Sequence, residues 1–222
     1  MEIRSVERPL KAVVEGFRSV STSTVSDILD RMGLDCVVSG IRAVKEGFKM
    51  VGPAVTIKEV SGVAGTYTIE DFKMGKVIDT AQPGDVLVFD NAGHEISTWG
   101  GMASTAAQVK GIEGVLIDGG SRDADEVVEL DFPVFSRYIT PRGARSRIRM
   151  VDMNGTVKCG GIRVRPGDIV MADRTGIIII PKEKAEEVLQ ITKKTEEGEK
   201  HFTEQLRRGK TFEQMHRETG QV

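Results

Sequence analysis

Residues 111–128 read Gly-Ile-Glu-Gly-Val-Leu-Ile-Asp-Gly-Gly-Ser-Arg-Asp-Ala-Asp-Glu-Val-Val, and this stretch decides how the chain is organised. Its apolar run at 115–117 predicts a short buried strand. Residues 118–121 have the composition of a loop, and a helix is predicted to follow them. Arg122 and Asp123 therefore come where a buried strand meets a helix, which is the usual place for ligands in α/β proteins.

Two interpretations of Arg122 and Asp123 remain open from this stretch alone. In the first, they are surface charges at the start of a helix over residues 124–130, because an aspartate favours the positive end of a helix dipole. In the second, the guanidinium and the carboxylate form a ligand-binding pair. The rest of the chain has to distinguish the two.

The composition of the chain excludes several classes of protein. It has 222 residues, a net charge of −2 and no dense basic block, which argues against a nucleic-acid surface. No apolar run is long enough to cross a bilayer, and the N-terminus has no apolar signal core. Cys36 and Cys159 lie among apolar neighbours and predict buried thiols in a reducing compartment. We expect a soluble cytoplasmic protein.

A glycine pair, Gly100 and Gly101, precedes a second predicted helix that ends at Gly111. The first backbone N–H groups of such a helix have no partner within it and can hold an anion. Most turns of this kind bind nothing, so the glycine pair alone is weak evidence for a site.

Turn-forming residues separate the other predicted elements. A hydroxyl-rich segment at 21–24 caps a helix that closes at Gly33. Gly-Pro and Pro-Gly turns introduce strand-like segments, and a hairpin turn precedes a last buried strand. The predicted strands cover residues 52–60, 86–90, 169–173 and 177–181.

The segment from Lys182 to the C-terminus is rich in Glu, Lys, Gln and Arg. Its pattern predicts a long helix or a helix pair, broken near Gly198 and Gly209. Residues 196–209 offer few apolar side chains for a core of their own. Either this part lies on another subunit, or it is a frayed, solvated tail.

Taken together, the motifs resemble the family of the regulator of ribonuclease E activity A, which includes the class II 4-hydroxy-4-methyl-2-oxoglutarate aldolases. The resemblance implies an α/β fold with three β/β/α layers, of the swivelling-domain type, assembled as a homotrimer or homohexamer. It divides the chain into a family domain over 1–181 and a C-terminal helical extension over 182–222 at a subunit interface. The segments that carry it are residues 24–29, 52–56, 83–86, 111–123 and 161–181.

The resemblance also implies roles for particular residues. Asp123 matches the aspartate that holds a divalent metal, Mg²⁺ or Mn²⁺, largely through water. Arg122 matches the arginine that binds the pyruvate unit of the substrate. The backbone N–H groups that bind its carboxylate map to Gly100, Gly101, Met102 and Ala103.

This chain departs from the aldolase pattern at Gly101, where the family has Asp or Glu. The missing acid puts aldol chemistry in doubt and leaves Arg122 and Asp123 in place. The family also draws an acid from the C-terminal helix of a neighbouring subunit. The candidates for it are Glu196, Glu197 and Glu199.

The chemistry implied is that of a metal-dependent lyase that forms a pyruvate enolate from a 2-oxo acid. A divalent cation stabilises the charge that develops on the 2-oxo oxygen, and retained waters favour Mg²⁺ or Mn²⁺. Retro-aldol cleavage needs a base for the 4-hydroxyl group, whereas oxaloacetate decarboxylation does not. With Gly101 in place of an acid, decarboxylation is expected to survive better than aldol cleavage.

The alternative is a non-catalytic regulator that docks onto a ribonuclease or a helicase. A third possibility, methyl transfer to a quinone, has no support because the chain has no glycine-rich nucleotide-type loop for a methyl donor. Binding of nucleic acid or of a membrane is not expected in either remaining case.

Overall fold

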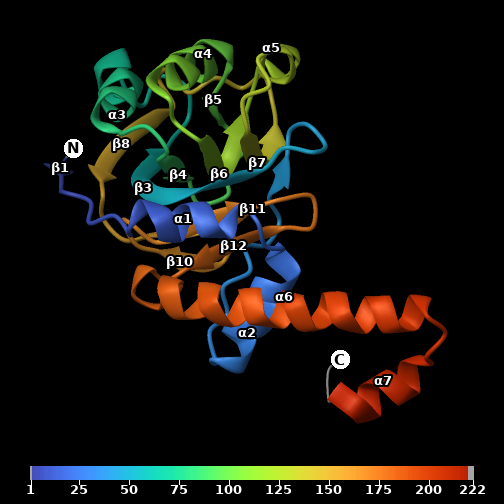
Figure 1. The fold of residues 1–222 in the computed structure, drawn as a ribbon. Helices are drawn as coiled ribbons and strands as arrows, with labels where there is room; N and C mark the ends of the chain where they lie inside the picture. Colours follow the sequence, from blue (N-terminus) through green and yellow to red (C-terminus); the bar gives the residue numbers. More distant parts are fainter. Residues whose placement is uncertain (1, 220–222) are drawn as a thin grey trace.

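A computed structural model describes residues 2–219 of the chain as a mixed sheet with helices on both sides (Figure 1). The strands are β1 (Glu2–Ile3), β2 (Arg42–Ala43), β3 (Met50–Ser61), β4 (Val86–Asp90), β5 (Ser97–Trp99), β6 (Gly114–Ser121), β7 (Val134–Ile139), β8 (Ile148–Met153), β9 (Val157–Cys159), β10 (Ile162–Val164), β11 (Ile169–Ala172) and β12 (Ile177–Ile180). The helices are α1 (Lys11–Phe17), α2 (Thr22–Arg31), α3 (Met74–Thr80), α4 (Gly101–Lys110), α5 (Ala124–Glu129), α6 (Ala185–Arg207) and α7 (Phe212–Thr219). Two short 3₁₀ helices cover Ile69–Asp71 and Lys182–Lys184.

The main sheet has the strand order β1-β8-β3-β4-β6-β7-β2. Strands β3, β4, β6 and β7 are parallel, while β8 runs antiparallel to β3. Strand β5 pairs with β6, and the antiparallel hairpin β11–β12 joins the sheet through β3. Helices α3, α4 and α5 cover one side of the parallel strands, and β10, β11 and β12 lie on the other (Figure 1). This arrangement confirms the expected α/β fold class.

The parallel strands β4 and β6 form the centre of the core, as their apolar runs predict. The side chains of residues 86–89 and 115–117 are fully buried. Strands covered on both faces need apolar residues throughout, which explains why these runs do not alternate with polar residues. Helices α1, α2 and α6 pack with β11 and β12 in a second apolar cluster, outside the main one.

The loop predicted over residues 118–121 is wrong, because β6 continues to Ser121. A register shift between Ile117 and Gly120 marks an irregularity in this part of the strand. A Cβ on Gly120 would lie 2.8 Å from Thr140 Cγ2 and 2.9 Å from the carbonyl oxygen of Ile96. These glycines therefore permit neighbouring chain segments to approach the strand closely, rather than forming a turn.

The predicted helix caps are confirmed at α2 and α4. Ser21 Oγ accepts a hydrogen bond of 3.1 Å from the backbone N–H of Thr24 at the start of α2. Helix α4 ends at Gly111, whose positive φ of 79° is the usual left-handed conformation after a helix.

The C-terminal segment forms one long helix and one short one. Helix α6 runs through Gly198, so the predicted break there is wrong, while the chain does turn at Gly209 with φ +98°. A single glycine costs a helix only about 1 kcal/mol, and its neighbours here are strong helix formers. The first turns of α6 bury Val188 and Leu189. The ring centroids of Phe202 and Phe212 of α7 lie 5.2 Å apart in a T-shaped contact.

Two further expectations are tested by the structure. Cys36 and Cys159 are both buried and free, as predicted. Burial raises the pKa of Cys36 to about 11 and also raises the pKa of Cys159, so both thiols are protonated at neutral pH. Among the helices of residues 2–219, none is both long and apolar enough to span a membrane.

Candidate active site

Arg122 and Asp123 form the connection between β6 and α5. The backbone N–H of Arg122 donates a 2.9 Å hydrogen bond to the carbonyl oxygen of Trp99, which ties this connection to the end of β5. Asp123 adopts the left-handed conformation, with φ 53° and ψ 43°, and is the N-cap of α5. Aspartate tolerates this conformation better than most residues, and the sharp turn lets a buried strand lead directly into a helix.

The structure brings the side chains of Arg122 and Asp123 together with the start of α4. Arg122 Nε lies 3.4 Å from Asp123 Oδ2, and the same oxygen accepts a 3.1 Å hydrogen bond from the backbone N–H of Gly101. The two side chains are 40 % and 37 % exposed, so solvent and small molecules reach them. They are not isolated surface charges, because both contribute to the wall of a cavity.

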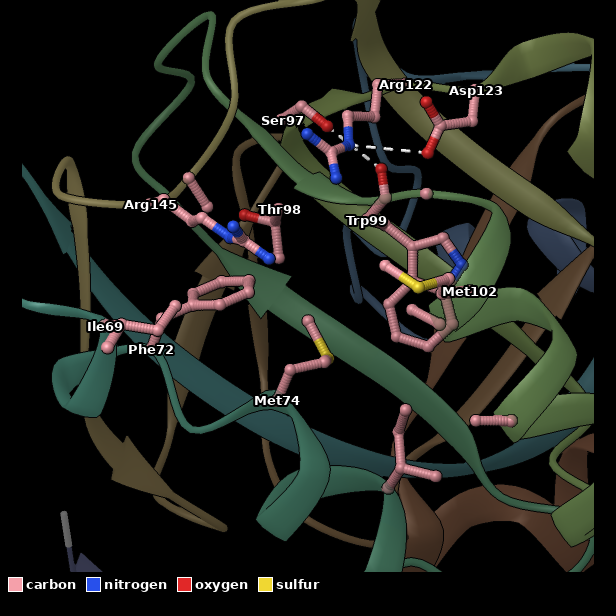
Figure 2. A pocket seen from close by; sticks show the side chains of 15 residues that line it. Ile69, Phe72, Met74, Ser97, Thr98, Trp99, Met102, Arg122, Asp123 and Arg145 are labelled. Atoms are coloured by element: carbon pink, nitrogen blue, oxygen red, sulfur yellow. Dashed lines mark hydrogen bonds and ion pairs between the residues drawn. The ribbon is translucent and has the colours of Figure 1, made fainter.

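This cavity of about 290 Å³ opens in front of β5 and α4 (Figure 2). Arg122, Asp123 and Arg145 supply its charged side chains, and Figure 2 shows Arg145 close to Thr98 and Phe72. Apolar side chains form most of the remaining wall: Ile69, Phe72, Met74, Ile78, Trp99, Met102, Ala103, Ala106 and Ala144. A mostly apolar pocket with a few convergent charges is typical of small-molecule sites.

The four residues predicted as a backbone cradle lie at the N-terminus of α4. Gly100 is the N-cap and α4 begins at Gly101, whose N–H is already bonded to Asp123. Within residues 2–219, no acceptor is found for the N–H groups of Met102 and Ala103, and both residues line the cavity. These two donors, at the positive end of a helix, suit a carboxylate.

Both glycines of this cradle leave room for acidic side chains. A Cβ on Gly100 would overlap Asp123 Oδ2, and a Cβ on Gly101 would overlap Glu126 Oε2. Sequence reasoning did not identify Glu126. A signal for it exists in the three-residue spacing from Asp123, which places both side chains on one face of the first turn of α5.

Glu59 on β3 is a second residue that sequence reasoning did not identify. It is 1 % exposed and accepts a 2.6 Å hydrogen bond from Thr98 Oγ1, while its other oxygen, Oε1, has no partner. Burial raises the pKa of Glu59 to about 8, against the opposing effect of the Thr98 hydrogen bond. The carboxyl group therefore lies behind the cavity in its protonated form at neutral pH.

The three C-terminal glutamates do not reach this site within one chain. Helix α6 lies on the opposite side of the sheet from α4 and α5 (Figure 1). Glu196 Oε1 instead accepts a 2.7 Å hydrogen bond from the backbone N–H of Ser21, at the N-cap of α2. Glu197 and Glu199 are exposed on α6.

A metal at this site would have few protein ligands. Across residues 2–219, no three His, Cys, Asp or Glu side chains converge as a metal-binding group. Asp123 is the carboxylate that lines the cavity, and its exposure leaves room for water. Because Mg²⁺ commonly keeps several waters and takes only one or two carboxylates, this donor set fits a hydrated hard cation and not Zn²⁺.

Comparison with known proteins gives one family. The family profile described as RraA-like: Aldolase/RraA matches residues 22–179. A protein of Halalkalibacterium halodurans named "Putative 4-hydroxy-4-methyl-2-oxoglutarate aldolase" is 35 % identical over 179 residues, which is 80 % of each chain. An uncharacterized protein of Methanocaldococcus jannaschii is 34 % identical and covers 78 % of this chain and 80 % of its own.

Solved structures share the fold. An uncharacterized protein from Pseudomonas syringae superposes with a TM-score of 0.83 at 28 % identity, covering 94 % of this chain and 98 % of that one. RraAS2 of Streptomyces coelicolor, described as an unusual member of the RNase ES inhibitor RraA protein family, has a TM-score of 0.79 at 31 % identity. The match covers 89 % of this chain and 98 % of that one.

Proposed function

The chain belongs to the RraA-like (Aldolase/RraA) family, and we propose that it is a divalent-metal-dependent lyase acting on 2-oxo acids through a pyruvate enolate. The proposed reactions are aldol cleavage of the 4-hydroxy-4-methyl-2-oxoglutarate type and decarboxylation of oxaloacetate. One observation carries this proposal: a guanidinium and a carboxylate, Arg122 and Asp123, meet at the N-terminus of α4 inside a cavity.

The residues of the cavity supply what a 2-oxo acid requires. Arg122 presents a planar set of N–H donors to the carboxylate or the 2-oxo oxygen, and such charge-assisted bonds are stronger than neutral ones. The N–H groups of Met102 and Ala103 are positioned for the remaining carboxylate oxygen. As the C–C bond breaks, negative charge grows on the 2-oxo oxygen, and fixed donors stabilise it without reorganisation.

Asp123 is the residue that would hold the metal, Mg²⁺ or Mn²⁺. The cation would supply Lewis-acid stabilisation of the developing negative charge, so that no Schiff-base lysine is needed. Asp123 in turn fixes the orientation of Arg122 through their contact.

We further propose a homotrimer or homohexamer, with residues 182–222 as an extension of a 1–181 domain at the subunit interface. The exposed Glu197 and Glu199 support this, since only a second copy would bring them to Asp123. Two buried free thiols support a cytoplasmic location. Light scattering of the purified protein, before and after truncation at Lys182, measures the assembly directly.

The test of the lyase function combines a product assay with a binding assay. Purified protein is given a panel of 2-oxo acids with Mg²⁺, with and without chelator, and pyruvate release is measured. Mn²⁺ binding is followed by electron paramagnetic resonance for wild type, Asp123→Ala and the control Asp125→Ala, an exposed acid on the same helix. We expect chelator-sensitive pyruvate release, and Mn²⁺ binding lost only in Asp123→Ala; absence of both would refute the proposal.

A second candidate is a regulator that binds a ribonuclease or a helicase without catalysis. The likeness to RraAS2, named as a member of an RNase inhibitor family, favours it. Inhibition of a purified ribonuclease at stoichiometric protein, together with no pyruvate release from any 2-oxo acid, would select this function over the lyase.

A further inference from the structure

Because residue 101 is a glycine, the Glu126 side chain can occupy the space that a side chain at position 101 would fill. A Cβ on Gly101 would overlap Glu126 Oε2 and come within 2.8 Å of Glu126 Cδ and 3.1 Å of its Cβ. Gly100 leaves room in the same way for Asp123 Oδ2 and for Arg122 Cγ, the latter at 3.1 Å. Two carboxylates thus lie over consecutive glycines at the start of α4, and of the two Asp123 lines the cavity.

The geometry of α5 explains why Glu126 points there. Asp123 is the N-cap and Glu126 is the third residue of the helix, so their side chains share one face of the first turn. A glutamate at this position often folds back to accept a hydrogen bond from the N-cap backbone. Here α5 has no such side-chain cap bond, and within residues 2–219 the Glu126 side chain forms no hydrogen bond or ion pair. The Glu126 backbone carbonyl accepts a hydrogen bond from the N–H of Leu130.

The Asp123 and Glu126 carboxylates therefore differ in their contacts within the protein. Asp123 Oδ2 is engaged by the backbone N–H of Gly101 at 3.1 Å and by Arg122 Nε at 3.4 Å. The Glu126 carboxylate is exposed and has no protein partner among the described residues, so it remains available to accept a proton.

We propose that Glu126 is the general base of aldol cleavage, an inference that rests on the proposed lyase function. Glu126 takes the proton of the substrate's 4-hydroxyl group, directly or through one water. The C4–O bond becomes a carbonyl, the C3–C4 bond breaks, and its electron pair passes to the pyruvate enolate. The proton held by Glu126 then returns to C3 of the enolate, which yields pyruvate and restores the carboxylate.

This role changes the expected order of the two reactions. Decarboxylation of oxaloacetate removes no hydroxyl proton, so it makes no use of such a base. The expectation that decarboxylation outlasts aldol cleavage depends on an acid being absent at position 101. Glu126 brings a carboxylate to that space from another helix, so wild-type protein is expected to catalyse both reactions.

The experiment compares both reactions in Glu126→Gln, with Mg²⁺ and with variants matched for folded fraction by thermal unfolding. We expect kcat for cleavage of 4-hydroxy-4-methyl-2-oxoglutarate to fall about 10²–10⁴-fold, the usual contribution of a general base. Decarboxylation of oxaloacetate is expected to fall less than about 10-fold, because its barrier includes no such proton transfer. Glu129→Gln, an exposed residue of the same helix, is the control for both reactions.

A second variant tests the space itself. In Gly101→Ala the new methyl group first meets the end of a flexible side chain, so the Glu126 carboxylate turns away and the fold is retained. The rate of aldol cleavage should then fall although Glu126 is still present. The double variant, Gly101→Ala with Glu126→Gln, should be no slower than Glu126→Gln alone.

Three results would overturn this assignment. They are equal losses of both reactions in Glu126→Gln, aldol cleavage unchanged in that variant, and fully additive losses in the double variant. Wild-type protein that releases pyruvate from neither substrate would overturn the lyase function and this inference with it.

Discussion

Two of the three glycine pairs in the chain lie near the candidate site, and their surroundings differ. Gly119 and Gly120 lie inside β6, where a Cβ on Gly120 would meet the Ile96 carbonyl oxygen at 2.9 Å. Gly100 and Gly101 open α4, where added side chains would meet Asp123 and Glu126. The first pair lies against the Asn91 and Thr140 side chains and the Ile96 carbonyl oxygen, whereas the second lies against ionisable side chains. We call Gly119 and Gly120 the strand pair, and Gly100 and Gly101 the helix pair.

This difference shows what a glycine pair in a sequence can and cannot indicate. In both pairs the hydrogen side chain permits close approach, but the partner decides the consequence. Buried neighbours within the sheet have little freedom to move, so the strand pair permits close packing. An exposed side chain such as Glu126 can rotate or exchange its contacts, so the helix pair leaves its ionisable neighbours room to move.

The largest expected effect is at Arg122, which follows the strand pair in sequence and lies against Gly100 of the helix pair in space. Arg122→Lys keeps the charge but loses the planar set of donors, and removal of one donor to a developing oxyanion usually raises the barrier by about 3–4 kcal/mol. We expect kcat/KM for pyruvate release to fall roughly 10²–10³-fold, measured by steady-state kinetics.

Its matched control is Arg163→Lys, an exposed residue of β10 outside the cavity. Activity of Arg122→Lys within a factor of three of the control would contradict the role proposed for Arg122.

The next effect compares the pairs directly through stability. Gly120→Ala places a methyl group 2.8 Å from Thr140 Cγ2 and 2.9 Å from the Ile96 carbonyl oxygen, and overpacking of this kind costs about 1–3 kcal/mol. Gly101→Ala is also at a buried position, but its methyl group meets the end of the flexible Glu126 side chain, so we expect a loss below about 1 kcal/mol. Urea unfolding of the two variants measures both values, and equal losses would remove the distinction between the pairs.

The smallest effect concerns Glu59 of β3. Its carboxyl group accepts a hydrogen bond from Thr98 of β5, the strand that precedes the helix pair. Because its folded pKa of about 8 exceeds the usual value, the folded state keeps a proton that the unfolded state has lost. Stability should therefore fall as pH rises from about 4.5 to about 8. Glu59→Gln, an uncharged isostere, should differ from wild type by less than about 1.5 kcal/mol at pH 5.

The two proteins should then diverge as the pH rises, with Glu59→Gln losing less stability by pH 8. Chemical denaturation at pH 5, 6, 7 and 8 tests this. Parallel stability curves over the whole range would show that Glu59 is ionised in the folded protein.

Much of the fold was predictable because it depends on local patterns. The apolar runs at 86–90 and 115–117 are buried strands, and glycine and serine mark helix ends at Gly111 and Ser21. The strand conformation of residues 118–121 was not predictable, because a turn-forming composition cannot reveal that Ile96 and Thr140 pack against an extended strand there.

The candidate site was predictable in part for the same reason. Arg122 and Asp123 are neighbours in the chain, so their proximity needs no tertiary information. Glu126 required the structure, because its contact is with Gly101, on another helix. Glu196 shows the opposite case, since its bond to Ser21 gives it a structural partner that the sequence pattern did not suggest.

The sequence by itself determined the buried strands, the helix ends and the adjacency of one guanidinium and one carboxylate, since hydrophobic period and capping act over a few residues. Only the tertiary structure decided which residues face each glycine pair. The physical reason is that such contacts join segments distant in sequence, and their distances are set by how the helices and strands pack rather than by any local preference.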